Sequence, residues 1–440
     1  MKTQQSRWEH SVVNHHDHDD DHNLTLSNCI PHEICFHIMT FLDMDTLIHK
    51  CFLISKSWNV MARKIPLSVL DMGSPIEQAH DRLKLLSNCQ QLMNITFMDL
   101  SRGREIHDKT DDIFKELATC TTLQNLKVLH ACGHLSDIGL QALAQSSYMS
   151  NLRELRLLFG NDGITEYGIQ ILSTSPMMRH LKILYLCDSK ISPRGVQHLV
   201  QANFKLTELQ LPQSDTDAVG SVGNGGAIAI GNSPQMNHLT ILNLENNAIE
   251  DEGALSLIRS EHMKNLTSLD LSSNLNLSKA VAMLIASTMK HLTHLTLGYT
   301  NIGEEGAIAI VTSPHMSNLT FLSLEGLRLG EVFAMKLASS SYCSKLKELH
   351  LFYNYLGDSG AQHIASSEYM KNLTSLYLGN NNIGDSGAKS IASSEYMKNL
   401  TNLSLCYNHI SDDGAMCISS SIYMSNLRML KMPNFRLTYK

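Results

Sequence analysis

Side chains that could bind a metal are concentrated near the N-terminus, where residues 15–22 contain four histidines and four aspartates. Imidazole and carboxylate groups at this density could ligate zinc or nickel weakly. The same stretch is of low complexity and has no apolar residue to anchor it, which favours disorder. We therefore predict that residues 1–23 form a disordered tail, and we assign no specific metal site.

Groupings typical of catalytic sites are missing from the sequence. There is no H-E-x-x-H, no C-x-x-C pair and no G-x-S-x-G, and the other histidines are scattered along the chain. The glycine-rich stretch 214–226 fits neither of the common phosphate-binding patterns, so we expect an exposed loop there. These observations predict a protein that is not an enzyme and needs no cofactor.

The elements that would position any binding residue come from a repeated leucine pattern. Leu373, Leu376 and Leu378 form L-x-x-L-x-L, which is followed by Asn381 and an apolar helical pattern ending near Ile391. Thirteen copies begin at Leu92, Leu123, Leu152, Leu181, Leu206, Leu239, Leu266, Leu292, Leu319, Leu346, Leu373, Leu400 and Leu427. Each copy predicts one short strand and one helix, since its apolar spacing changes from two to about 3.6 residues.

Within one copy, alternation places Leu376 and Leu378 inward and Ser375, Tyr377 and Gly379 outward. Asp385 or Ser386 is expected to cap the helix that follows. An inward asparagine should bond the backbone of each turn, because a buried amide needs partners. The asparagines concerned are Asn247, Asn274, Asn354, Asn381 and Asn408.

The pattern resembles leucine-rich repeats of the helix-containing, ribonuclease-inhibitor-like kind. This resemblance implies an α/β solenoid, with a curved parallel sheet on the concave face and helices on the convex face. We assign residues 67–440 to it, with a terminal half-repeat at 427–440 and a degenerate first strand near Leu70.

The 22 methionines could suggest metal or redox chemistry, but their register indicates a core position. A methionine or cysteine lies three residues before the first leucine of most copies. The residues in this slot are Cys89, Cys120, Met149, Met178, Met236, Met263, Met289, Met316, Cys343, Met370, Met397 and Met424. We therefore predict buried thioethers and free thiols, and neither metal sites nor disulfides.

Residues 24–66 do not follow the repeat and are expected to form three short helices. Pro31 fits the first position of a helix, and Ile34, Ile38 and Phe41 recur on one face. The pattern Ile30-Pro-x-Glu-Ile34, followed by Ile38, Phe41-Leu-Asp43, Leu47 and Leu53-Ile-Ser-Lys-x-Trp58, resembles the F-box.

By this resemblance, the segment would bind the Skp-type adaptor of a cullin–RING ubiquitin ligase. The residues implied in adaptor binding are Ile30, Pro31, Ile34, Ile38, Phe41, Leu42, Leu47, Leu53 and Trp58. A second interpretation is a helical cap that shields the first repeat, which solenoids also require.

A target would bind the concave face of a curved solenoid, where the late copies expose aromatic residues. The candidate substrate-binding residues are Tyr299, Phe321, His350, Phe352, Tyr353, Tyr377 and Tyr407. The alternative is that some of these rings fold sideways and only cover the sheet.

The predicted function is substrate recognition in a Skp–cullin–F-box ubiquitin ligase, with the solenoid holding a protein target. The alternative is a scaffold or regulator outside ubiquitination, such as an inhibitor or a GTPase activator. A formal net charge of −7 gives no basic footprint for nucleic acid, and no apolar run is long enough for a membrane span. We expect a cytoplasmic or nuclear protein.

Overall fold

The structure is a computed structural model that describes residues 69–71, 95–100, 110–213, 221–432 and 436–438. The F-box-like segment and the histidine- and aspartate-rich tail lie outside these residues. All the described residues belong to one compact unit, residues 67–440, which contains the repeats.

The described strands form one sheet in which the strand order follows the chain order. Strands β1 to β14 run parallel, and β15 pairs antiparallel with β14. The strands are β1 Val69–Asp71, β2 Phe97–Leu100, β3 Val128–Ala131, β4 Glu154–Leu157, β5 Ile183–Leu186, β6 Glu208–Gln210, β7 Ile241–Asn243, β8 Ser268–Asp270, β9 His294–Thr296, β10 Phe321–Ser323, β11 Glu348–His350, β12 Ser375–Tyr377, β13 Asn402–Ser404, β14 Met429–Lys431 and β15 Arg436–Thr438.

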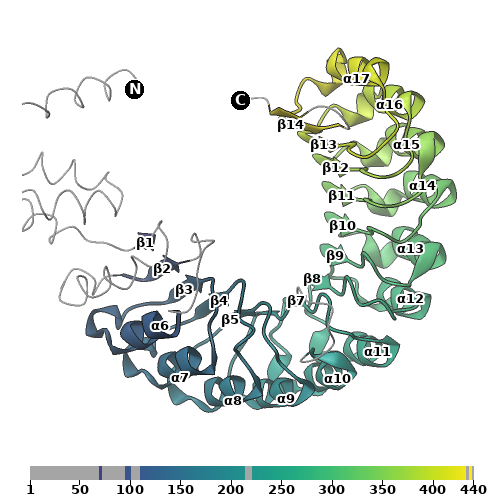
Figure 1. Cartoon of the computed structure of the whole chain (residues 1–440). Helices are drawn as coiled ribbons and strands as arrows, with labels where there is room; N and C mark the ends of the chain where they lie inside the picture. The colour runs from purple at the N-terminus through teal and green to yellow at the C-terminus, as the bar shows by residue number, and fades with distance from the viewer. Residues whose placement is uncertain (1–68, 72–94, 101–109, 214–220, 433–435, 439–440) are drawn as a thin grey trace, which may run out of the picture. The chain divides into compact units, whose positions relative to one another are not determined.

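From β2 to β14, helices connect successive strands and lie on the outer side of the curved sheet (Figure 1). They are α6 Thr110–Thr119, α7 Asp137–Gln145, α8 Glu166–Thr174, α9 Pro193–Gln201, α10 Gly223–Asn232, α11 Asp251–Arg259, α12 Lys279–Thr288, α13 Gly303–Val311, α14 Glu331–Ala338, α15 Gly357–Ala365, α16 Asp385–Ala392 and α17 Asp412–Ser419. A short 3-10 helix follows most of them and leads into the next strand. The predicted leucine-rich-repeat solenoid is confirmed.

The core is a stack of leucines contributed by neighbouring copies. Leu322, Leu349, Leu376 and Leu403 lie directly opposite one another in register, and all are fully buried. The methionine and cysteine slot is buried in every described copy that has one, from Cys120 to Met424. The described cysteines are free thiols, as predicted.

The predicted asparagine ladder is present and links adjacent copies. The Asn274 amide nitrogen donates to the carbonyls of Leu244, Leu271 and Ser272 at 2.9–3.2 Å. Its oxygen accepts from the backbone N–H groups of Asn247 and Ile249. A single side chain thereby satisfies backbone groups of two turns, which would otherwise be buried without partners.

The capping prediction is wrong for α16, because Asp385 is the first residue of that helix and Gly384 precedes it without a side-chain cap. The Asp385 carboxylate instead accepts from the backbone N–H and the hydroxyl of Ser411 in the next copy, at 2.8 and 2.7 Å. The Asp358 carboxylate likewise accepts hydrogen bonds from the backbone N–H groups of Gly384 and Gly387 in the next copy. The starts of α16 and α17 are therefore bonded by a carboxylate from the preceding copy, a contact that a pattern local to one helix cannot reveal.

Two more expectations require correction. The stretch 214–226 is not one exposed loop, because α10 begins at Gly223 and both Val222 and Gly226 are buried. Residues 214–220 lie outside the described part. Ser375 and Gly379 point to the open face as expected, yet both are buried, because neighbouring side chains cover them.

Candidate protein-binding surface

The seven predicted aromatic and histidine residues lie on or just after strands β9 to β13. Phe321, His350 and Tyr377 are on β10, β11 and β12, and Phe352 lies two residues after β11. Tyr299, Tyr353 and Tyr407 occupy the turns that follow β9, β11 and β13. The structure thus places all seven along one continuous set of strands.

Six of these seven rings form one chain of contacts. His350 is the centre, with ring centroids 5.0 Å from Phe321 and 4.2 Å from Tyr377. From Tyr377 the contacts continue to Phe352, Tyr353 and Tyr299, with centroid separations of 6.1–6.5 Å. Tyr407 makes no ring contact within the described part of the chain, and it is 73% exposed.

His294 extends the chain of rings at its other end and is absent from the predicted set. Its ring stacks on Phe321 with a centroid separation of 5.7 Å. Its position at the start of β9 is the signal that could have identified it, since Phe321 lies directly opposite on β10.

The three tyrosines of the turns share an unusual backbone conformation. Tyr299, Tyr353 and Tyr407 have φ values of 53–56°, in the left-handed region. The same turn position in other copies holds Asp188, Asn246, Ser273, Gly326 and Asn380. Four of these are Asp, Asn or Gly, the types that tolerate this region best. Tyrosine is unfavourable there, yet it occupies this position in alternate late copies.

Some rings do cover the sheet, as the alternative interpretation held. Phe352 lies against Gly379, where an added Cβ would be 2.1 Å from the ring, and Tyr299 lies over Gly326 in the same way. Tyr299 and Tyr353 nevertheless remain 40% and 49% exposed. Tyr299 therefore both covers the sheet and stays partly exposed, and Phe352 covers the sheet beside the exposed Tyr353.

Carboxylate groups lie beside the aromatic rings of this surface. His350 Nδ1 is 3.1 Å from Glu325 and its Nε2 is 2.7 Å from Glu348. Burial lowers the pKa of His350, but the hydrogen bonds to both carboxylates outweigh burial and raise it above its ordinary value. The histidine is thus held between two acids on adjacent strands.

A second group of acids lies on the neighbouring copies. Burial, followed by the charges of Asp270 and Glu325, raises the pKa of Glu245 to about 7. Burial also raises the pKa of Asp270, although its hydrogen bonds with Ser272 oppose this. No described basic side chain pairs with Glu245 or Asp270, so the sheet carries like charges that destabilise it.

Replacing Glu245 by Gln should make stability less dependent on pH. Because the pKa of Glu245 is raised when folded, its contribution is complete below about pH 4.5 and is lost as pH rises through about 7. Glu245→Gln should raise the free energy of unfolding by about 1–3 kcal/mol at pH 8 and leave it nearly unchanged at pH 4.5. Urea unfolding at both pH values measures this. An equal effect at both would contradict the charge explanation, and Glu395→Gln, on an exposed outer turn, is the control.

The early strands differ because their charged groups pair with one another. Arg156 Nε donates to Glu154 at 2.5 Å, and the Arg156 guanidinium lies 4.2 Å from the centroid of the Tyr185 ring. Tyr185 in turn donates its hydroxyl hydrogen to Glu208 at 2.8 Å. This network leaves little unpaired charge for a partner, so the late strands are the better candidate surface.

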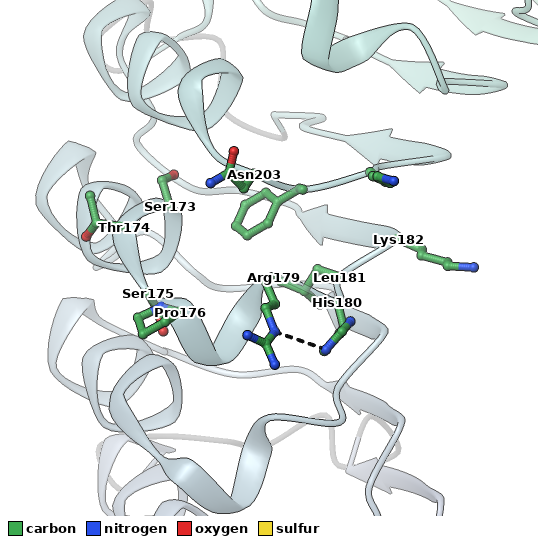
Figure 2. Close-up of a pocket in the computed structure, with 11 residues that line it drawn as sticks. Ser173, Thr174, Ser175, Pro176, Arg179, His180, Leu181, Lys182 and Asn203 are labelled. Atoms are coloured by element: carbon green, nitrogen blue, oxygen red, sulfur yellow. Dashed lines mark hydrogen bonds between the residues drawn. The ribbon is translucent and has the colours of Figure 1, made fainter.

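A pocket of about 640 Å³ lies between the copies that begin at Leu152 and Leu181. It exists because α9 leads to β6 without the usual 3-10 helix, and Ala202 replaces the serine found at this position in most copies. Figure 2 shows Arg179 bonded to His180, whereas Lys182 points away from Arg179. Its basic groups do not converge, so the pocket is a consequence of the short copy rather than a built site.

The described residues also limit other kinds of site. Within them, no three His, Cys, Asp or Glu side chains come together in a group able to hold a metal ion. None of their helices has the length and apolar composition needed to cross a bilayer. The histidine- and aspartate-rich residues 15–22, to which we assigned no specific metal site, lie outside this region.

Comparison with known proteins identifies the repeat. The Leucine Rich repeat family matches residues 235–257, 288–311, 342–365, 369–392 and 396–419. An internalin (inlF) of Listeria monocytogenes is similar in structure, with a TM-score of 0.40 and 21% identity over 72% of this chain and 89% of that chain. A chain of the yeast Rad7 and Elc1 complex is also similar, with a TM-score of 0.45 and 15% identity over 82% and 91%. No curated protein matches the sequence.

Proposed function

We propose that this protein is a substrate-recognition subunit of a Skp–cullin–F-box ubiquitin ligase. Leucine-rich repeats are protein-interaction scaffolds, and the late strands present exposed rings at their edge. The proposal depends on one combination, which is an F-box-like sequence at residues 30–58 in front of a solenoid with an open aromatic face.

In this role the chain contributes geometry and no bond-making chemistry. The F-box-like segment would bind the adaptor through Pro31, Ile34 and Leu42, among the other residues predicted for it. The solenoid would hold a target beside the ubiquitin donor, and tethering raises the effective concentration of its lysines. Exposed aromatic groups suit this task, because they give a large contact area at a small entropic cost.

Adaptor capture tests the proposal. The full chain should co-purify a Skp-type adaptor, and Ile34→Asp with Leu42→Asp should reduce capture at least about tenfold, since buried carboxylates would disrupt an apolar interface. Removal of residues 1–23 should leave capture intact and serves as the control. The unfolding midpoint of the repeats should be unchanged in both variants.

Two outcomes would contradict the proposal. Failure of the full chain to capture any adaptor, or equal capture by the double variant, would favour the scaffold or regulator outside ubiquitination. The repeat surface would then still need a partner, but not one destined for ubiquitination.

A further inference from the structure

Between β7 and β13 the aromatic face carries acidic groups and no lysine or arginine, whereas the outward slot of β14 beyond it holds Lys431. Across the outward positions of β7 to β13 and the two residues after each strand, there are four carboxylates and two histidines. The carboxylates are Glu245, Asp270, Glu325 and Glu348, and the histidines are His294 and His350. His350 is already held between Glu325 and Glu348, so the surface keeps an excess of negative charge.

Glu325 lies beside Tyr299 and Tyr353. The backbone N–H of Tyr299 donates to the Glu325 carbonyl at 2.7 Å, and the Tyr299 and Tyr353 rings are 6.3 Å apart. The equivalent position in the preceding copy is Gly298, which has no side chain to cover Glu325. A Cβ added there would be 3.1 Å from the Glu325 backbone nitrogen. A carboxylate and two partly exposed rings are thus accessible together, and both attract a cationic side chain.

The spacing of the tyrosines fits an extended chain. Tyr299, Tyr353 and Tyr407 follow every second strand, which places their backbones about 10 Å apart for strands about 4.8 Å apart, although the rings of Tyr299 and Tyr353 lean to within 6.3 Å of each other. About three residues of extended polypeptide cover the same length. A peptide crossing the strands could therefore present a side chain to each ring in turn.

We propose that this face binds an extended basic segment of a protein partner, with lysine or arginine at Glu325 and at the Glu245–Asp270 pair and apolar groups on the tyrosines. Only the identification of this partner as the recruited target rests on the proposed function. An acidic peptide or a nucleic acid would be repelled by the same carboxylates. Residues 15–22 of this chain, with four aspartates, are likewise not complementary.

A phage library of randomised twelve-residue peptides, selected on the full chain, tests this directly. Selected peptides should be enriched in lysine and arginine, and their synthetic forms should bind in fluorescence anisotropy. At pH 8, where Glu245 is ionised, Glu325→Gln and Glu245→Gln should each weaken binding about 5- to 30-fold, because each removes one charge without changing shape. Glu368→Gln, on the exposed 3-10 helix Glu368–Met370, should leave binding unchanged.

Several results would overturn the inference. These are enrichment of acidic peptides, absence of any enrichment, and binders that ignore both substitutions. Self-association of the chain that is lost in Glu325→Gln would assign the face to a second copy instead. Because the assay contains no adaptor, failed adaptor capture would not change its outcome, and failed peptide binding would leave the ligase proposal standing.

Discussion

Replacement of Asn274 by alanine should destabilise the repeat unit by about 3–5 kcal/mol, a loss at the upper end of what single substitutions cause. The side chain is fully buried and donates to three carbonyls while it accepts from two backbone N–H groups. Alanine would leave those groups without partners and without access to water. Urea unfolding monitored by circular dichroism measures the loss as a lower midpoint.

Two further variants test whether the loss of stability comes from the asparagine ladder or from a general intolerance of substitution. Asn265→Ala changes an exposed asparagine nine residues before Asn274, whose amide donates to the Asn237 carbonyl, and it should cost less than about 1 kcal/mol. Asn274→Thr should give an intermediate loss, because Thr300 fills the equivalent position and donates to the Leu297 carbonyl at 2.7 Å. Equal losses in all three variants would refute the ladder explanation.

The ladder also shows what the sequence could predict. Asparagine at a fixed place after L-x-x-L-x-L predicted a buried amide, and leucine alternation predicted the inward face, because both depend on spacing within one copy. The methionine slot followed from the same register. These features recur in most copies, so one sequence supplied many observations of the same constraint.

Contacts between copies were harder to predict. Asp385 looked like a cap for its own helix, whereas it caps the next one, 26 residues further along the chain. The same limit applies to the surface. Spacing identified the outward aromatics, but it could not reveal that Phe352 covers Gly379 or that His350 bridges two acids. Such contacts depend on the stacking distance and on side-chain direction, which one copy does not encode.

Tyr299, Tyr353 and Tyr407, whose backbones lie in the left-handed region, suggest that some stability is lost in favour of binding. A residue with a large side chain in this conformation costs on the order of 1 kcal/mol relative to asparagine or glycine. Tyr407 makes no ring contact that could offset this cost among the described residues, and it is the most exposed of the three. The binding role that we propose for this face would explain why it is tyrosine, since Asn380 fills the equivalent turn one copy earlier.

Replacing all three tyrosines with asparagine should therefore abolish partner binding without unfolding the protein. Each ring is expected to contribute about 1–2 kcal/mol to binding, so Tyr299→Asn, Tyr353→Asn and Tyr407→Asn together should weaken it at least about 100-fold. The selected basic peptides provide the measurement by anisotropy. Asparagine keeps the turn, because Asn246 and Asn380 already adopt the same backbone conformation.

Measurements of stability check independently that the variants still fold. Tyr407→Asn alone should raise the free energy of unfolding by about 0.5–1 kcal/mol, because it relieves left-handed strain and removes little buried area. Tyr167→Asn, a 55% exposed tyrosine on helix α8, is the matched control and should leave peptide binding unchanged. If the triple variant bound the peptides normally, the tyrosines would be coverings of the sheet rather than contacts for a partner. If Tyr407→Asn lowered stability instead, the turn would not be strained, and the case for selection on binding would lose its physical basis.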